Sequence, residues 1–115
     1  MTFTVTPEAD ASCAGDAALT VRLAGELDMS TVPELDVCLS QLVRDGCRHL
    51  LVDLHELVFC DSTGLACLVR GNNRCASLGG WLRVTRDRGH VARVLAISGL
   101  DQFLRYEPEE TAPSR

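Results

Sequence analysis

The sequence contains no lysine, and eleven arginines stand against sixteen aspartates and glutamates, which gives a formal net charge of -5. Proteins that bind nucleic acid through its phosphates carry a basic excess or a clustered basic patch. We therefore expect no nucleic-acid partner. Aromatic residues make up only 4% of the chain, which argues against a large aromatic binding platform.

Long apolar runs are also missing. No window approaches the roughly 18 consecutive apolar residues of a membrane span, and the amino-terminal MTFTVTPEAD lacks the basic start and apolar stretch of a signal peptide. We expect a cytoplasmic protein without a membrane span. The chain has 115 residues, the size of one domain, and its 46% hydrophobic and 23% charged content is typical of soluble globular proteins.

The cysteines lack the spacing of a metal or disulfide motif. The six are Cys13, Cys38, Cys47, Cys60, Cys67 and Cys75, and no two form a C-x-x-C pair. In the cytoplasm they are expected to be reduced, and no histidine or cysteine spacing matches a zinc template. Phosphate-binding glycine loops are absent as well. We therefore expect no metal and no cofactor.

Hydrophobic periodicity predicts strands alternating with helices. Period-two alternation predicts strands at 3–7 and 19–25, joined as a hairpin by a loop at 9–18. The remaining predicted elements are a helix with Ser30 or Thr31 as N-cap and Gly46 at its end, a strand at 49–54, a helix at 63–78, a strand at 81–85, a helix at 90–99 and a short strand at 102–106. This order indicates an α/β fold, with a mixed four- to five-stranded sheet packed by three or more helices.

The turn CDSTG gathers an acid, two hydroxyls and a glycine after a predicted strand. Loops that follow parallel strands meet at one edge of a sheet, so this turn and the earlier GELD are expected at the same edge. Judged from the residues alone, Ser62 or Thr63 most simply caps the next helix. Alternatively, Ser62 displays its hydroxyl where a phosphoryl group would meet free amides, with Asp61 and Asp28 beside it. Gly64 leaves room for whatever approaches.

A serine hydrolase is a weaker interpretation of the same turn. The G-x-S-x-G elbow is absent around Ser62. The candidate bases are better explained otherwise, with His49 opening a strand, His55 in the loop after it and His90 starting a helix. We therefore expect no enzymatic activity.

Four segments together resemble the STAS domain of bacterial anti-sigma-factor antagonists: GELD, LLVDLHELVFCDSTGLACLV, LGGWLRVT and VLAISGLDQFLRY. The resemblance covers residues 3–107 and leaves 108–115 as a polar tail expected to be disordered. It implies binding to an anti-sigma factor serine kinase with release of a sigma factor, phosphorylation of Ser62 that ends binding, and a PP2C-type phosphatase that restores it. The partner-binding residues implied are Asp28, Asp61, Ser62, Thr63, Gly64 and Leu65.

Some residues depart from the family pattern. Thr63 replaces a frequent second serine, and Cys60 replaces a larger apolar residue, which predicts looser packing under the turn. His55 and Cys60 suggest redox or metal chemistry, but two such residues are too few to hold a metal. Met29, Arg70 and Asn72 are candidate specificity residues. An alternative function with the same fold is an adaptor in a signalling assembly or a lipid-transport ATPase complex, without a phosphorylation switch.

Overall fold

The structure is a computed structural model that describes residues 3–8, 17–87, 89–99 and 104–106. The elements are β1 (Thr4–Pro7), β2 (Leu19–Leu27), α1 (Val32–Arg44), β3 (His49–Cys60), α2 (Ser62–Ala76), β4 (Trp81–Thr85), α3 (His90–Ser98) and β5 (Arg105–Tyr106). Their order is the one that the sequence predicts. Most of the predicted loop at 9–18 and all of the predicted tail at 108–115 lie outside the described residues.

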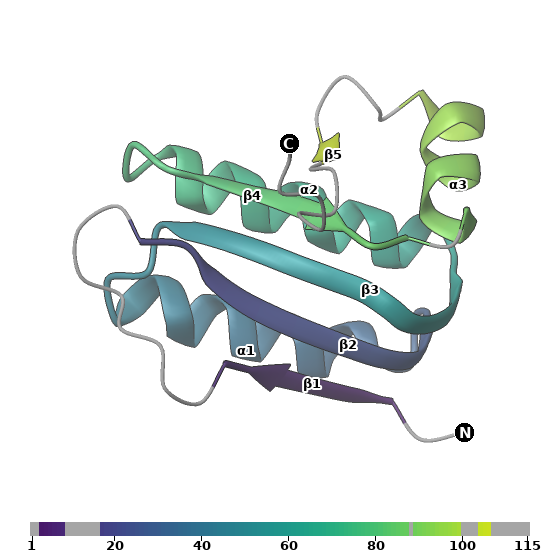
Figure 1. The fold of residues 1–115 in the computed structure, drawn as a ribbon, viewed down its shortest axis with the longest axis horizontal. Coiled ribbons are helices and arrows are strands. Elements are labelled where there is room, and N and C mark those ends of the chain that lie inside the picture. Colours follow the sequence, from purple (N-terminus) through teal and green to yellow (C-terminus); the bar gives the residue numbers. More distant parts are fainter. Residues whose placement is uncertain (1–2, 9–16, 88, 100–103, 107–115) are drawn as a thin grey trace, which may run out of the picture.

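The strands form one mixed sheet in the order β1-β2-β3-β4-β5 (Figure 1). β1 pairs with β2 in antiparallel fashion, as the predicted hairpin requires, and the other neighbouring pairs are parallel. Parallel neighbours need a crossover segment between them, and α1 and α2 occupy the crossovers from β2 to β3 and from β3 to β4. The predicted α/β class with a mixed sheet is therefore confirmed.

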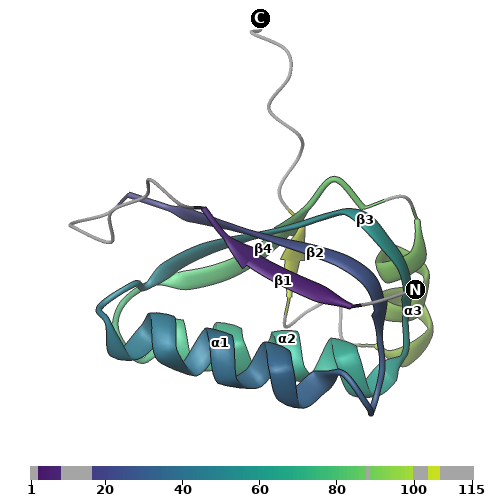
Figure 2. The same cartoon turned by 90° about the horizontal axis from the view of Figure 1, so that it is seen from below.

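Helices α1 and α2 lie side by side against one face of the sheet, and α3 lies at one end of it (Figure 2). Apolar side chains from the strands and from the helices form one buried cluster, at roughly 1.5–3 kcal/mol for each large side chain fully removed from water. The cluster includes Val21, Leu23, Leu50, Val52, Leu54, Leu82 and Val84 from the strands, Leu35, Leu39, Leu65 and Leu68 from α1 and α2, and Val91 and Leu95 from α3.

Helix α1 begins where the sequence predicts, with Thr31 at the N-cap position and a proline in its first turn. The Thr31 side chain does not cap the helix. Its hydroxyl instead accepts a hydrogen bond from the Asp28 amide (2.9 Å) and donates one to the Glu26 carbonyl (2.8 Å). The threonine therefore ties the start of α1 to the end of β2.

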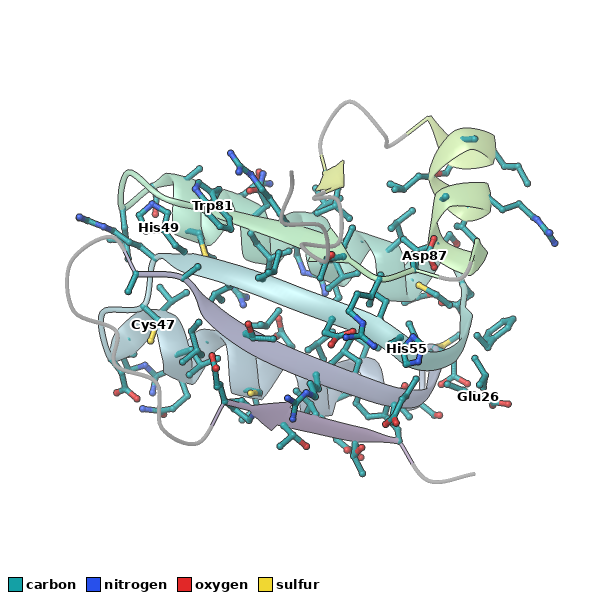
Figure 3. The ribbon with its side chains drawn as sticks, viewed as in Figure 1. Glu26, Cys47, His49, His55, Trp81 and Asp87 are labelled. Carbon is teal, nitrogen blue, oxygen red and sulfur yellow. The ribbon has the colours of Figure 1, made fainter. Side chains whose placement is uncertain are left out.

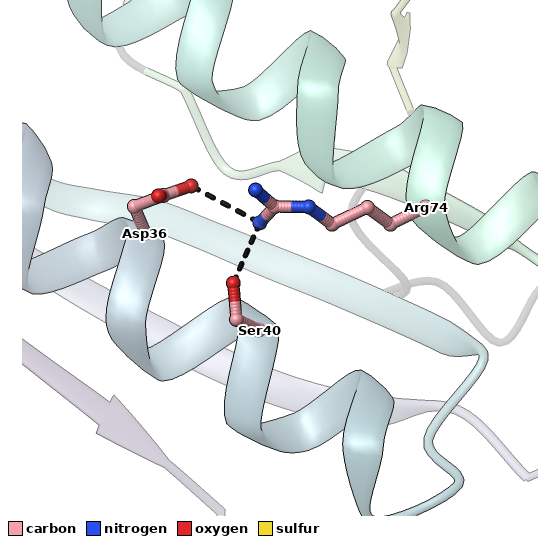
Figure 4. Close-up of polar contacts among 3 residues, drawn as sticks. All are labelled: Asp36, Ser40 and Arg74. Atoms are coloured by element: carbon pink, nitrogen blue, oxygen red, sulfur yellow. Dashed lines mark hydrogen bonds and ion pairs between the residues drawn. The ribbon is translucent and has the colours of Figure 1, made fainter.

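Arg74 of α2 fastens the two helices to each other (Figure 4). One of its guanidinium nitrogens lies 3.0 Å from a carboxylate oxygen of Asp36 and 2.8 Å from the Ser40 hydroxyl, both on α1. The Arg74 and Asp36 side chains are each 36% exposed, so water screens the pair and its net contribution is about 0.2–1 kcal/mol. The contact mainly fixes how the helices align.

Strand β3 is longer than predicted, because it continues past Leu54 to Cys60. His55 consequently lies within a strand, and its predicted place in a loop is wrong. Pairing with β2 continues through register shifts between Arg22 and Ala24 and between Gly25 and Glu26. Such irregularities bend a strand locally and change the direction of its side chains.

The start of β4 packs closely against the chain just before β3. The amide of Trp81 donates to the Arg48 carbonyl at 2.8 Å, and a Cβ added to Gly80 would lie 1.8 Å from that same oxygen. On the helix side, the Asn72 side-chain oxygen accepts from the Leu82 amide at 2.9 Å. Asn72 therefore joins α2 to β4, and its predicted part in specificity stays a prediction.

Gly79 and Gly80 provide a matched test of this packing. Gly80→Ala is expected to lower the free energy of unfolding by about 3 kcal/mol or more, because the methyl group meets backbone that cannot move aside. Gly79 has φ +83 and open space around its Cβ position, so Gly79→Ala is expected to cost only about 1–2 kcal/mol of left-handed strain. Urea denaturation of both variants measures the difference, and equal losses would contradict the packing described.

Candidate functional site

The turns after β2 and β3 meet at one edge of the sheet. Leu27 pairs with Cys60 at the ends of the two parallel strands, and the Asp61 amide donates to the Leu27 carbonyl at 3.2 Å. A hollow of about 620 Å³ lies over this edge, lined by Asp28, Met29, Ser30 and Asp61. The expectation that GELD and CDSTG share an edge is therefore confirmed.

Asp28 organises the first of these turns. One of its carboxylate oxygens accepts hydrogen bonds from the Ser30 amide (2.9 Å), the Ser30 hydroxyl (2.7 Å) and the Thr31 amide (3.3 Å). The hydrogen bond from the Ser30 hydroxyl is the largest cause that lowers the pKa of Asp28 below its usual value. Asp28 is consequently a fixed negative charge at neutral pH.

The N-cap of α2 is Asp61, whose carboxylate accepts from the Gly64 amide at 2.9 Å. The favoured sequence-based interpretation, in which Ser62 or Thr63 caps the helix, is therefore wrong. An aspartate before the hydroxyls already satisfies the amide that they would have served. Ser62 becomes the first residue of α2 and is exposed.

Gly64 and Leu65 face the fold rather than the solvent. A Cβ added to Gly64 would lie 2.6 Å from Leu27 Cγ and 2.9 Å from the Leu27 carbonyl oxygen, so glycine allows the helix to approach the end of β2. Leu65 has an exposed fraction of 0%. Both residues shape the turn by packing against the fold, and their predicted part in partner binding stays a prediction.

The geometry leaves the Ser62 hydroxyl exposed at the start of a long helix, on the edge that also carries the Asp28 and Asp61 carboxylates. Ser62 opens the 15-residue α2, where the first amides have no partner within the helix and the dipole is positive. A phosphoryl group on Ser62 would find amide donors there. It would also add negative charge beside Asp61 and near Asp28.

The histidines are placed elsewhere. His49 begins β3, at the opposite end from Ser62, and packs edge-on against Trp81 with ring centroids 5.1 Å apart. His55 lies on β3 toward the end that also carries Glu26 (Figure 3), and it lines a different hollow. The side chain of His90 is outside what the structure describes.

This second hollow, of about 370 Å³, is lined by Arg22, Leu23, Asp53, His55, Glu56 and Arg86. Asp53 is buried, accepts from the His55 amide at 2.9 Å and lies 3.6 Å from Arg86 Nε. Arg86 has a left-handed backbone, with φ 61. The following Asp87 accepts from the Val91 and Ala92 amides at the start of α3. The charged groups here hold the connection from β4 to α3 in place.

Burial makes the thiols of Cys60, next to the site, and of Cys75, at the other end of α2, poor nucleophiles. Loss of hydration, followed by the charges of Asp61 and Asp87, raises the pKa of Cys60 to about 12, and burial raises that of Cys75 to about 11. Cys47 is disulfide-bonded, so the expectation of six reduced thiols is wrong at that position. In the described part of the chain, no three metal-binding side chains gather, and no helix is long and apolar enough to cross a bilayer.

The sequence missed one feature of this edge. Phe59 is 45% exposed although it belongs to the apolar run that leads into the turn. Such a run normally indicates burial, and only the bulged pairing with Glu26 reveals the difference. Met29, a predicted specificity residue, is 73% exposed and lines the hollow.

Comparisons with known proteins agree with this geometry. A family model described as "Mlab, STAS domain" matches residues 13–106. The anti-sigma-B factor antagonist of Staphylococcus aureus is 32% identical over 84 residues, 73% of this chain and 78% of that protein. A crystal structure of an anti-sigma factor antagonist from Mycobacterium paratuberculosis has a TM-score of 0.75 and 25% identity, covering 96% of this chain and 87% of that one.

The Bacillus cell fate determinant SpoIIAA in its phosphorylated form shares the fold. Its TM-score is 0.65 and its identity 20%, with 95% of this chain and 94% of that chain covered.

Capping by Asp61 predicts a contrast between adjacent residues. Asp61→Ala is expected to lower the free energy of unfolding by about 0.5–2 kcal/mol, because the Gly64 amide loses its partner. Asp61→Asn keeps an acceptor and should remain close to wild type, and Ser62→Ala should also have little effect. Thermal and urea denaturation of the three variants measure this contrast. A larger loss in Ser62→Ala than in Asp61→Ala would show that the serine is the cap.

The raised thiol pKa values predict slow alkylation. At pH 8 the native Cys60 and Cys75 thiols should resist iodoacetamide, whereas the partly exposed Cys38 reacts first and all react in urea. The folded pKa of Cys60 exceeds its ordinary value of 9.0, so its stabilising contribution is present below pH 9 and is lost as the pH rises toward 12. Peptide mass mapping after timed labelling measures this, and rapid native labelling of Cys60 would contradict its burial.

Proposed function

This chain belongs to the STAS-domain family of anti-sigma factor antagonists, and from that premise we propose that it binds an anti-sigma factor serine kinase and so frees a sigma factor for transcription. Its relatives of that name are regulatory binding proteins rather than enzymes. Binding of the kinase takes place at the edge that carries Asp28, Asp61, Ser62 and Thr63. The protein acts in the cytoplasm.

Phosphorylation of Ser62 by the same kinase ends the interaction, and a PP2C-type phosphatase restores it. The observation that carries this proposal is that Ser62 is exposed and does not cap the helix, because Asp61 is the N-cap residue of α2. A serine that is neither buried nor needed by the helix is free to be modified without loss of the fold. The existence of SpoIIAA in a phosphorylated form, within the same fold, is consistent with such a switch.

Electrostatics explains why a phosphoryl group would weaken binding without unfolding the protein. It adds about -1.5 to -2 charges, which the amides and dipole at the start of α2 stabilise. The added charge lies beside the carboxylates of Asp61 and Asp28 that line the same hollow. A partner surface fitted to the unmodified edge must then desolvate a dianion among like charges.

A second candidate function is a constitutive adaptor in a signalling assembly or a lipid-transport ATPase complex. It is favoured by the description of the matching family model, which names Mlab and not an antagonist. In such an adaptor the Asp-Ser-Thr-Gly turn would serve only as the start of α2. Ser62 would then remain unmodified in the complex.

Intact-mass analysis separates the two candidates. The purified protein is mixed with ATP and each anti-sigma kinase of the source genome, and modified peptides are mapped. We expect the gain of one phosphoryl group at Ser62, lost in Ser62→Ala and retained in Thr63→Ala. Ser62→Ala should still bind the kinase, and Ser62→Glu should bind at least about tenfold more weakly. A kinase that binds but never modifies Ser62 would contradict the switch and favour the adaptor.

A further inference from the structure

Apolar side chains are exposed beside the proposed phosphoacceptor. Met29 is 73% exposed, Phe59 45% and Val58 41%. Exposed apolar residues scattered singly need no explanation, but a group of them at one edge marks an interaction surface. These three lie in or next to the two turns that meet at the Ser62 edge.

Their positions follow from the strand register. Met29 comes directly after Asp28 and lines the hollow together with Ser30 and Asp61. Phe59 pairs with Glu26 in the last stretch of the β2–β3 ladder, one pair before Leu27 and Cys60. The label of Glu26 in Figure 3 marks this end of the sheet. Met29 is thus contributed by the turn after β2, and Phe59 by the end of β3.

Acidic side chains accompany the apolar ones. Glu26 is exposed, Asp28 has a lowered pKa, and Asp61 lines the hollow. Among the residues that the structure describes, those lining this hollow include two carboxylates and no basic side chain. The edge therefore carries exposed apolar side chains together with negative charge, a pattern that a basic partner surface with an apolar pocket would complement.

We propose that Met29 and Phe59 are the apolar anchors through which the kinase that modifies Ser62 docks on this edge. This inference rests on the proposed function and specifies the surface that the kinase recognises. Its complementary surface carries an apolar pocket bordered by arginine or lysine. Glu26, Asp28 and Asp61 form the acidic rim that meets those basic groups.

Phosphoryl transfer itself requires the kinase to cover this edge of the protein. The γ-phosphate of bound ATP must come in line with Ser62 Oγ, so the kinase has to cover the edge that carries this serine. The positive charge that holds ATP in a kinase then faces the acidic rim. A stable interface buries about 800 Å² on each partner, far more than one serine offers, so the neighbouring Met29 and Phe59 side chains fall within it.

The apolar anchors and the phosphorylation of Ser62 affect binding through different interactions. Burial of Met29 and Phe59 in the complex favours binding in either state of Ser62, whereas the phosphoryl group acts by charge. Loss of an anchor should therefore raise both the Kd for the kinase and the KM for phosphorylation, and leave kcat at saturation unchanged. Loss of the serine hydroxyl should abolish phosphorylation and spare binding.

The test compares Met29→Ser and Phe59→Ser with a matched control at the other end of the sheet. Leu78 is 43% exposed and lies between α2 and the start of β4, next to the end where His49 pairs with Trp81. Titration calorimetry against the kinase that modifies wild-type Ser62 should give a Kd raised by about tenfold or more for each anchor variant. Leu78→Ser should stay within about twofold of wild type.

Two further variants separate docking from folding. Phe59→Leu and Met29→Leu keep an apolar side chain and should retain affinity within about threefold, with melting temperatures compared for every variant. Anchor variants that are folded and bind within twofold of wild type would overturn the docking surface while leaving the Ser62 switch intact. A wild-type chain that no kinase binds or modifies would overturn the proposed function, and this inference with it.

Discussion

The parallel register that sets Leu27 opposite Cys60 is the constraint on which the rest of the structure depends. Because both strands end at this pair, the turn that carries Asp28 and the turn that carries Ser62 are forced to the same edge. The Asp61 amide reinforces the arrangement by donating to the Leu27 carbonyl, and Gly64 lets α2 approach the same residue. A shift in this register would separate the two turns, and the residues of the site would no longer lie together.

The site combines a rigid frame with an unengaged hydroxyl. Asp28 is held by Ser30 and Thr31, and Asp61 is held by the Gly64 amide, so both carboxylates keep their places whether or not a partner is bound. Ser62 alone among these groups has no part in holding the turn. Charge added there changes what a partner meets without disturbing what keeps α2 in position, and that separation is what a binding switch requires.

The sequence predicts the order of elements, the mixed sheet and the meeting of the two turns, because apolar periodicity and turn residues are local properties. The extension of β3 through His55 depends on bulged pairing with β2, a long-range effect invisible to local patterns. The choice of Asp61 over Ser62 as cap was not predictable either, since all three side chains of the turn are good caps. Likewise, the burial of Leu65 and the exposure of Phe59 depend on the directions in which β3 enters the turn and α2 continues from it.

The measurement that tests the central claim most directly is the affinity of the kinase for the Ser62-phosphorylated protein relative to the unmodified protein, at two salt concentrations. The account predicts binding weaker by about a hundredfold at low salt, a smaller ratio at high salt as charges are screened, and an unchanged melting temperature. Equal affinity of the two forms, or a phosphorylated protein that binds weakly only because it is unfolded, would contradict it.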